Sequence, residues 1–296
     1  MADTQQEQQE AQAADLSRRD FVTMTAAAGL AVAAGATASA QMPVVEKNVE
    51  IKMPDGTCDA AFIHPANGSH PGVLIWADAF GLRPALREMG KRLAAEGYSV
   101  LIPNPFYRTA KAPVLDMATF NFGREADRAK LGPLMGPATA PGNAEKDAVA
   151  YVAWMDAQPQ VNKAKKIGTQ GYCMGGGLVV RTAATLPDRI GAGASFHGGG
   201  LVTDMPGSPH LLASKIKGRM YFGVARNDDE RQPAAKDTLR QSFAAAKVPT
   251  EVEVYASLHG WCMSDMPAEP GMPIYNKADA DKAWGKLLAL YKAGLA

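Results

Sequence analysis

The stretch GYCMGG (residues 171–176) places one cysteine between glycines, at a point where a strand is expected to end and a helix to begin. Gly171, Cys173 and Gly175 have the spacing of a tight turn in which small neighbours let the backbone bend and display the central side chain. The following helix N-terminus favours the thiolate, which is the nucleophilic form of cysteine. The pattern therefore predicts a nucleophile at Cys173. The alternative is an inert cysteine buried in a glycine-rich turn.

Two further segments supply the groups that such a nucleophile needs. The run Asn227-Asp228-Asp229 follows the apolar segment GRMYFGVA, and His259 follows the segment EVEVYAS. Each comes directly after a predicted strand, and the order along the chain is nucleophile, acid, histidine. A histidine that moves the proton and a carboxylate that orients the histidine are the partners that acyl transfer requires. We therefore expect these groups to meet at one edge of a sheet.

The pattern of the remaining chain predicts the elements that would bring them together. Two strand-like runs, VVEKNVEIKM and CDAAFIHP, are separated by the turn residues 54–56 and predict an antiparallel hairpin. Strand-like and helical segments then alternate, with helices expected at residues 84–97, 143–158, 175–186, 233–246 and 277–291. This alternation predicts a mostly parallel central sheet flanked by helices, with reactive loops at the carboxyl ends of the strands. Together with the glycine-flanked turn at Cys173, it is the arrangement of an α/β-hydrolase fold. Residues 105–142 are loop-rich.

Residues 1–40 have the order of a signal peptide. A polar leader reaches Arg18-Arg19, an apolar stretch follows, and small residues end it at 38–40. The paired arginines resemble a twin-arginine export signal, which implies export of the folded protein to a bacterial periplasm by that machinery. A frayed amphipathic helix is the alternative. We expect the mature domain to span residues 41–296, without stable membrane insertion because no segment has the roughly 20 apolar residues that a spanning helix needs.

The composition narrows the classes of molecule that the protein is expected to bind. Hydrophobic residues make up 47% of the 296 and charged residues 21%, which is ordinary for a globular enzyme. Lys and Arg total 31 against 30 for Asp and Glu, so no basic field is available for nucleic acid, and a small-molecule partner is expected. Cys and His do not recur at zinc-ligand spacing, and the only glycine-rich turn contains the proposed nucleophile, so no metal or organic cofactor is expected. Three cysteines leave at least one thiol unpaired, and whether Cys58 and Cys262 pair stays open.

The segments ADAFGL, GYCMGG, NDDERQP and SLHGW occur in this order, and together they resemble the dienelactone hydrolase family (carboxymethylenebutenolidases) over residues 44–296. The resemblance implies that Cys173 is the nucleophile, that His259 is the base, and that an aspartate of NDDERQP orients the histidine. Counting from the strand selects Asp228, whereas counting back from the proline selects Asp229. We prefer Asp228 because a strand end fixes geometry more firmly than a loop does.

The resemblance also implies an acidic residue that contacts the resting thiol, at the position of Asp78. An aspartate is one methylene shorter than the family's glutamate, which leaves open whether it reaches the sulfur. In this fold, two backbone N–H groups bind the oxyanion, one after the nucleophile and one after an early strand, which by position are those of Met174 and Ala79.

Two more residues are candidates for substrate binding. Relatives that act on the dienelactone carboxylate have an arginine four residues after the histidine, where this chain has Met263. Arg108 could bind an anionic substrate instead, with a solvated surface arginine as the alternative. His197 ends a predicted strand and could line the pocket, although its place in the chain order is wrong for the base.

The activity implied is hydrolysis of an ester or lactone bond of a small molecule, of the dienelactone type, through a Cys-His-Asp triad and a thioester intermediate. The alternatives are a general periplasmic carboxylesterase or thioesterase, and a ligand-binding module that kept the fold without the chemistry. A thiol redox protein is disfavoured because no C-x-x-C occurs.

Overall fold

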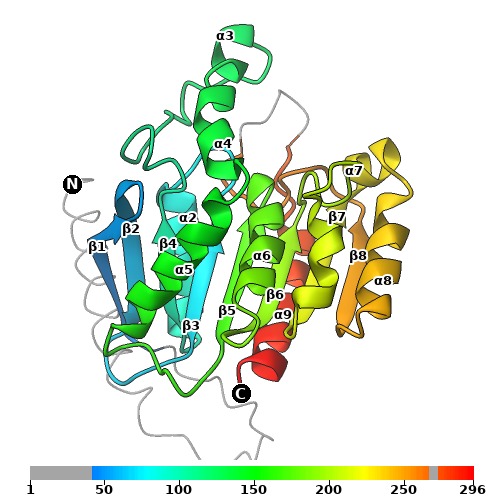
Figure 1. Ribbon diagram of the computed structural model, residues 1–296. Coiled ribbons are helices and arrows are strands. Elements are labelled where there is room, and N and C mark those ends of the chain that lie inside the picture. The colour runs from blue at the N-terminus through cyan, green and yellow to red at the C-terminus, as the bar shows by residue number, and fades with distance from the viewer. Residues whose placement is uncertain (1–41, 267–272) are drawn as a thin grey trace, which may run out of the picture. The chain divides into compact units, whose positions relative to one another are not determined.

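One sheet of eight strands runs through the part of the chain that the computed structural model describes, residues 42–266 and 273–296 (Figure 1). The leader assigned to residues 1–40 lies outside these residues. The strand order is β1-β2-β4-β3-β5-β6-β7-β8. The strands are β1 (Val44–Met53), β2 (Gly56–Pro65), β3 (Gly72–Trp76), β4 (Ser99–Pro103), β5 (Ile167–Tyr172), β6 (Ile190–Phe196), β7 (Arg219–Ala225) and β8 (Thr250–Tyr255).

The sheet is antiparallel at one end and parallel over the rest. The hairpin β1–β2 pairs Val44 with Pro65 and Met53 with Gly56, and β2 runs antiparallel to β4. From β4 to β8 all pairs are parallel. The predicted hairpin and the predicted mostly parallel sheet are both confirmed. The carboxyl ends of β3, β5, β7 and β8 therefore lie along one edge.

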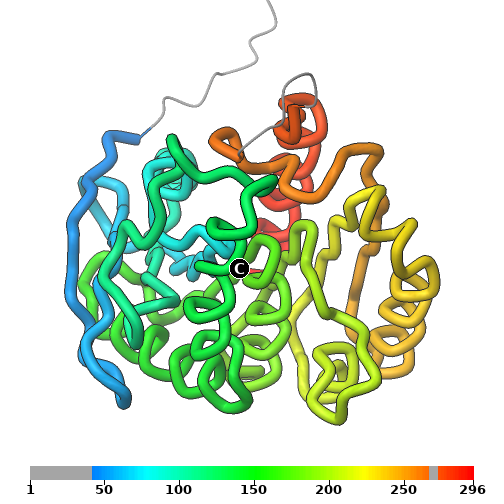
Figure 2. Tube along the Cα trace, turned by 90° about the horizontal axis from the view of Figure 1, so that it is seen from above, coloured from blue at the N-terminus to red at the C-terminus, as the bar shows by residue number. Residues whose placement is uncertain are grey.

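Helices cover both faces of this sheet, as the view from above shows (Figure 2). Helices α5, α6 and α8 pack on one face, and α2 and α9 pack on the other. The helices of the described residues are α2 (Pro84–Ala95), α3 (Glu125–Arg128), α4 (Leu131–Thr139), α5 (Asn143–Asp156), α6 (Met174–Thr185), α7 (Arg226–Arg231), α8 (Ala235–Ala245) and α9 (Lys277–Gly294), with a 3₁₀ helix at Pro209–Lys215.

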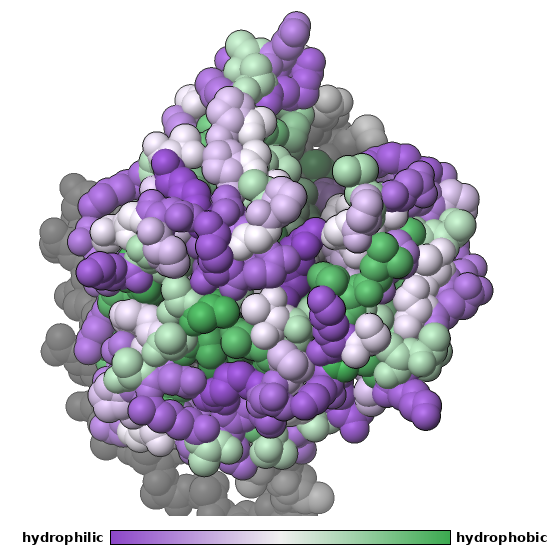
Figure 3. All heavy atoms as spheres, viewed as in Figure 1, coloured by the Kyte–Doolittle hydropathy of each residue, from purple (hydrophilic) through white to green (hydrophobic). Residues whose placement is uncertain are grey.

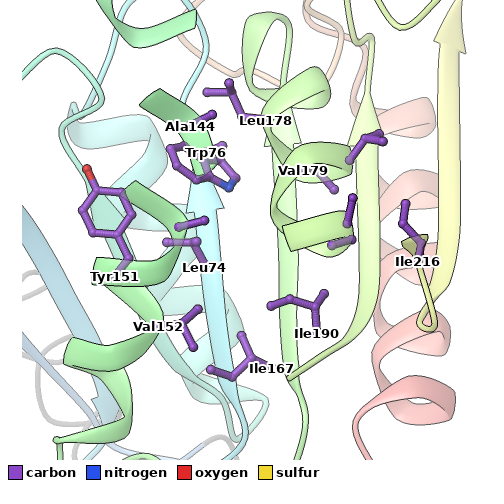
Figure 4. Close-up of a cluster of buried hydrophobic side chains, with 14 of the residues drawn as sticks. Leu74, Trp76, Ala144, Tyr151, Val152, Ile167, Leu178, Val179, Ile190 and Ile216 are labelled. Atoms are coloured by element: carbon purple, nitrogen blue, oxygen red, sulfur yellow. The ribbon is translucent and has the colours of Figure 1, made fainter. Parts of the chain in front are cut away.

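One face of strand β3 is anchored in the core by Leu74 and Trp76. Leu74 and Trp76 lie against side chains of α5, with the Tyr151 ring near the indole (Figure 4). The two rings meet edge to face with centroids 5.6 Å apart, and the Trp76 indole N–H donates to Thr182 of α6 at 3.0 Å. Since a buried polar group is costly without a partner, this bond fixes β3 against α6. The loop that leaves β3 therefore starts from a rigid position.

The segment 105–142, expected to be loop-rich, contains two short helices. Helices α3 and α4 project beyond the carboxyl edge of the sheet (Figure 1), and the surface around α3 is mainly hydrophilic (Figure 3). The sequence LGPLMGPAT of α4 contains two prolines and two glycines, residues typical of turns, and these hide its helical pattern. The apolar side of α4 packs inward through Leu134 and Ala138.

Candidate active site

Cys173 stands between β5 and α6 with a backbone that few residue types adopt. Its φ is 53° and its ψ is −117°, which is outside the favoured regions for a residue with a side chain. Such strain costs on the order of 1–3 kcal/mol and is typical of functional positions. A Cβ at Gly171 would lie 2.2 Å from the Gly175 oxygen, and one at Gly175 would lie 2.6 Å from the Trp76 oxygen. Only glycine fits at either position.

His259 follows β8 and is held by groups on the short helix α7. Its ring Nδ1–H donates to Asp228 Oδ2 at 2.6 Å, and its backbone N–H donates to Asn227 Oδ1 at 2.8 Å. Asp229, one residue later, is instead bound by Lys236 Nζ at 2.7 Å and 2.9 Å. Of the two candidate aspartates, Asp228 is therefore the one that contacts the histidine ring. Asn227 was not singled out from the sequence.

The electrostatics of this pair favour a charged imidazole. Burial alone would lower the pKa of His259, but hydrogen bonding to Asp228 and Cys173 and the charges of these two side chains outweigh it and raise the pKa to about 10. An imidazolium beside a sulfur nucleophile is the arrangement in which the histidine is ready to donate a proton to a leaving group. The structure thus brings together Cys173, His259 and Asp228, which come from three separate parts of the chain.

Among the backbone N–H groups around Cys173, two that have no hydrogen-bond partner within the described residues are candidates for an oxyanion site. One belongs to Met174, the first residue of α6. The other belongs to Ala79, in the turn after β3, where the next two amides are used: Phe80 N–H donates to Asp78 Oδ1 at 3.0 Å and Gly81 N–H donates to the Asp78 carbonyl at 3.1 Å. The tight approach of Gly175 to the end of β3 brings this turn against the start of α6.

Asp78 is bound by Arg83 and forms no hydrogen bond to the thiol within the described residues, contrary to one of the two possibilities left open by the sequence. Its carboxylate is 1% exposed and accepts hydrogen bonds from Arg83 Nη1 at 2.7 Å and Nη2 at 2.9 Å. No hydrogen bond joins it to Cys173 within residues 42–266 and 273–296. The shorter side chain and a nearby guanidinium together explain the difference, because Arg83 takes both carboxylate oxygens.

His197 does not line a pocket, which corrects the assignment of this residue to substrate binding. Its side chain is 0% exposed, and its Nδ1 accepts a hydrogen bond from the Cys173 backbone N–H at 3.1 Å. The ring lies beside that of His259, with centroids 4.8 Å apart. Burial lowers the pKa of His197 well below its usual value, and the charge of His259 lowers it further. His197 is a neutral support beneath the turn that displays Cys173.

Arg108 is also corrected, because it is bound by two carboxylates of the protein. Its guanidinium donates to Asp147 of α5 at 2.7 Å and 2.8 Å and to Asp55 of the β1–β2 turn at 2.7 Å. These bonds join the hairpin to α5, and they satisfy the charge of Arg108 without a substrate. Met263, at the position where some relatives have an arginine, is fully buried.

The projecting segment 105–142 contacts both sides of the site. Phe106 and Leu134 pack against Met174, which follows the nucleophile. Phe120 packs edge to face on Phe80, with centroids 5.0 Å apart, and Phe80 follows Ala79. The segment therefore covers the residues next to both free N–H groups.

The remaining thiols are separate from the site, and all three cysteines are free, so Cys58 and Cys262 do not pair. Both are buried, and burial raises the pKa of Cys58 to about 12. Within the described residues, no group of three or more His, Cys, Asp or Glu side chains is arranged to hold a metal ion. No helix in this part of the chain is long and apolar enough to cross a membrane.

A nucleophile turn after a central parallel strand, with a histidine and an acid at later strand ends, defines an α/β hydrolase. The comparison with known families narrows this class. The dienelactone hydrolase family matches residues 58–295, and the chain belongs to that family. It is therefore a carboxylic ester hydrolase, and the alternative of a ligand-binding module without chemistry is not supported.

Individual relatives agree with this assignment. The chain is 27% identical over 243 residues to a carboxymethylenebutenolidase of Rhodococcus opacus, covering 80% of this chain and 87% of that protein. Among solved structures, a dienelactone hydrolase-like promiscuous phosphotriesterase from metagenomic libraries has a TM-score of 0.67 at 23% identity, covering 86% of this chain and 99% of that one. A dienelactone hydrolase of Anabaena variabilis has a TM-score of 0.59 at 16% identity, with the same two coverages. These two structures share the fold.

Proposed function

We propose that this hydrolase cleaves a small ester or lactone through a triad of Cys173, His259 and Asp228 and a thioester intermediate. The observation that carries the proposal is the strained Cys173 backbone at the start of α6, beside a histidine ring that Asp228 holds at 2.6 Å. A strained backbone costs free energy, and proteins keep such strain mainly where it holds a functional side chain in position. The raised pKa of His259, about 10, fits a proton donor paired with a thiolate.

The proposed reaction has two steps. The Cys173 sulfur attacks the carbonyl carbon, and the C–O bond to the alcohol breaks as His259 gives its proton to the leaving oxygen. In the second step His259 takes a proton from water, the hydroxide attacks the thioester carbonyl, and the sulfur leaves as thiolate. In both steps the oxyanion would be bound by the N–H groups of Met174 and Ala79, and each such donor contributes about 3 to 4 kcal/mol in comparable sites.

We propose a class of substrate rather than one compound. Arg108 is bound by Asp55 and Asp147, and Met263 is buried, so neither offers a cation to a substrate carboxylate. This favours uncharged esters and lactones over the anionic dienelactone. A general carboxylesterase or thioesterase on the same site is the second candidate, and acyl thioesters belong in the substrate panel for that reason.

The test is a panel of lactones, p-nitrophenyl esters and acyl thioesters, assayed with and without iodoacetamide. Cys173→Ala should reduce hydrolysis to background with the fold intact, because the turn accepts a small residue. Cys58→Ala, which removes a thiol buried in β2, should retain activity. Mass spectrometry of enzyme quenched during turnover should find an acyl group on the peptide that contains Cys173. Full activity in Cys173→Ala would overturn the triad.

We further propose that residues 1–40 direct export of the folded protein to the periplasm by the twin-arginine route. Arg18-Arg19, the apolar stretch after them and the small residues at 38–40 support this proposal. Three free cysteines are compatible with an oxidising compartment only if they are kept apart, and Cys58 and Cys262 are both buried.

A further inference from the structure

Arg83 lies buried between two parts of the site that are far apart in the sequence. Its side chain is 2% exposed, and it forms ion pairs with Asp78, in the turn after β3, and with Asp265, six residues after His259. An arginine is almost never this buried unless all its donors are used. The proposed reaction leaves this residue without a role, and nothing in the sequence pattern distinguished it.

All five N–H groups of the guanidinium have an acceptor. Nη1 donates to Asp78 Oδ1 at 2.7 Å and to the Gly81 carbonyl at 3.2 Å, and Nη2 donates to Asp78 Oδ2 at 2.9 Å. The other side of the fork reaches Asp265, with Nε to Oδ2 at 2.8 Å and Nη2 to Oδ1 at 3.0 Å. Two bidentate pairs on one planar group fix both carboxylates in distance and in orientation.

On one side, Arg83 fixes the turn that carries the Ala79 N–H. Asp78 accepts from Phe80 N–H through its side chain and from Gly81 N–H through its carbonyl, and Arg83 binds the same side chain and the Gly81 carbonyl. The turn is closed on itself by these bonds and tied to the rest of the site by the guanidinium. The Ala79 N–H takes part in none of these bonds and is therefore available to an oxyanion.

On the other side, Asp265 belongs to a series of turns that begins at Leu258 and includes His259. Backbone bonds run from Trp261 to Leu258, from Met263 to Gly260 and from Met266 to Met263. These bonds make residues 258–266 one continuous unit. The position of Asp265 is therefore coupled to that of the histidine loop, while the His259 ring and backbone have their own partners in Asp228 and Asn227.

We propose that Arg83 is a positioning residue that holds the oxyanion-binding turn 78–81 in register with the histidine loop 258–266. The inference rests on the proposed function, since it assigns to Arg83 the placement of the Ala79 N–H relative to the triad. Lysine cannot replace arginine in this role, because a single ammonium group has no planar fork and cannot bind two carboxylates bidentately. A misplacement of about 1 Å near reacting atoms costs about 100-fold in rate.

The test compares two reactions of the same sulfur. Ester hydrolysis needs the oxyanion donors, whereas alkylation of Cys173 by iodoacetamide passes through no oxyanion. Arg83→Lys should lower kcat for a p-nitrophenyl ester about 100-fold with a small change in KM, and its alkylation rate against pH should superimpose on that of the wild type. The matched control is Arg189→Lys, which alters another arginine bound bidentately by an aspartate, Asp156, without contact to the site. This control should keep both reactions.

If Arg83→Lys does not fold, Asp265→Asn provides a milder test, because Asp265 is 29% exposed and asparagine keeps its shape. It should lower kcat by a smaller factor, again with unchanged alkylation. Wild-type kcat in Arg83→Lys and Asp265→Asn, or equal losses in hydrolysis and alkylation, would overturn the inference. Neither result would contradict the assignment of the triad. That assignment would be contradicted by activity in Cys173→Ala.

Discussion

The histidine of the site is held at two points, and both partners come from consecutive residues. Asp228 binds the ring Nδ1–H, and Asn227 binds the backbone N–H of the same residue. With Nδ1 carrying a proton toward Asp228, the Nε2 position is the one left to exchange protons with the sulfur and the substrate. The neighbouring Asp229 has a different partner, because its carboxylate is bound by Lys236 of α8.

We predict that these two aspartates differ sharply in function. Asp228→Asn should lower kcat by about 10⁴-fold, as loss of the orienting carboxylate does in comparable triads. Asp229→Asn breaks only a partly exposed ion pair, of a kind that contributes about 0–1 kcal/mol to stability, and should leave kcat near the wild-type value. Steady-state kinetics of both variants on one ester measure the difference, and the reverse ranking would contradict the assignment.

The pH dependence of activity gives a second test that distinguishes the two aspartates. Burial lowers the pKa of His259, but the hydrogen bonds and charges of Asp228 and Cys173 raise it to about 10, so its proton is retained below that pH and lost above it. Activity should therefore fall on the alkaline side near pH 10 in the wild type. Removing the Asp228 charge should move this fall to lower pH, whereas Asp229→Asn should leave it in place.

Helix α6 and strand β3 approach each other so closely that no side chain fits between them. A Cβ at Gly175 would lie 2.6 Å from the Trp76 oxygen and 2.7 Å from the Ala77 oxygen, and both of these are backbone atoms that cannot rotate away. This approach sets the separation between the start of α6, where Met174 lies, and the turn that carries Ala79. The two amide groups proposed to bind the oxyanion are thus spaced by one glycine contact.

We predict that Gly175→Ala destabilises the protein by about 1–3 kcal/mol, as overpacking does, and lowers kcat because it separates the two amide groups. Gly177→Ala is the matched control on the same helix. A Cβ at Gly177 would meet Pro209 at 3.7 Å, an ordinary contact, and alanine is favoured over glycine in a helix by about 1 kcal/mol. Urea unfolding measures the stability of the two variants, and steady-state kinetics measure their kcat. Equal losses in the two variants would mean that the close contact at Gly175 has no special role.

Local patterns in the sequence were sufficient for the strands of the sheet and for the turn that carries Cys173, but not for the short helix that carries Asp228. The hairpin, the alternation of strands and helices, and the glycine-flanked turn each depend on neighbouring residues, so their periodicity and turn residues predicted them. The helix α4 was missed because its prolines and glycines are typical of turns, and α7 because Asn227, Asp228 and Asp229 read as a polar loop.

The contacts of buried charged residues could not be predicted in the same way. Arg83 and Asp265 are 182 positions apart, and no local pattern links them. The sequence does not show that Arg108 is bound by Asp55 and Asp147, so it was a candidate substrate ligand. The sequence places His197 at the end of a strand, but it does not show that the ring is buried against the Cys173 backbone. Long-range pairing is set by tertiary structure, and a single sequence gives no direct measure of it.

At the scale of the whole molecule, the proposed export signal lies in residues 1–40 and the catalytic groups in residues 78–259. We predict that Arg18→Lys combined with Arg19→Lys keeps the full-length precursor in the cytoplasm, because the twin-arginine pair would no longer be recognised. Cell fractionation followed by N-terminal sequencing should find wild-type protein in the periplasm, beginning near Gln41. Arg219→Lys, at an exposed position of β7, is the control and should be exported normally; unchanged export of the double variant would contradict the route.

Because two of the three thiols are buried, the number of intact active sites in a sample can be measured by thiol titration. In the folded protein, Cys58 and Cys262 are buried and Cys173 is the partly exposed cysteine, so a chromogenic thiol reagent has one sulfur to react with per native chain and three after unfolding. The ratio of these two titres gives the fraction of molecules whose nucleophile is intact, before any substrate is known. Rates measured on different preparations can then be expressed per working centre, and chains already oxidised at Cys173 are excluded from the count.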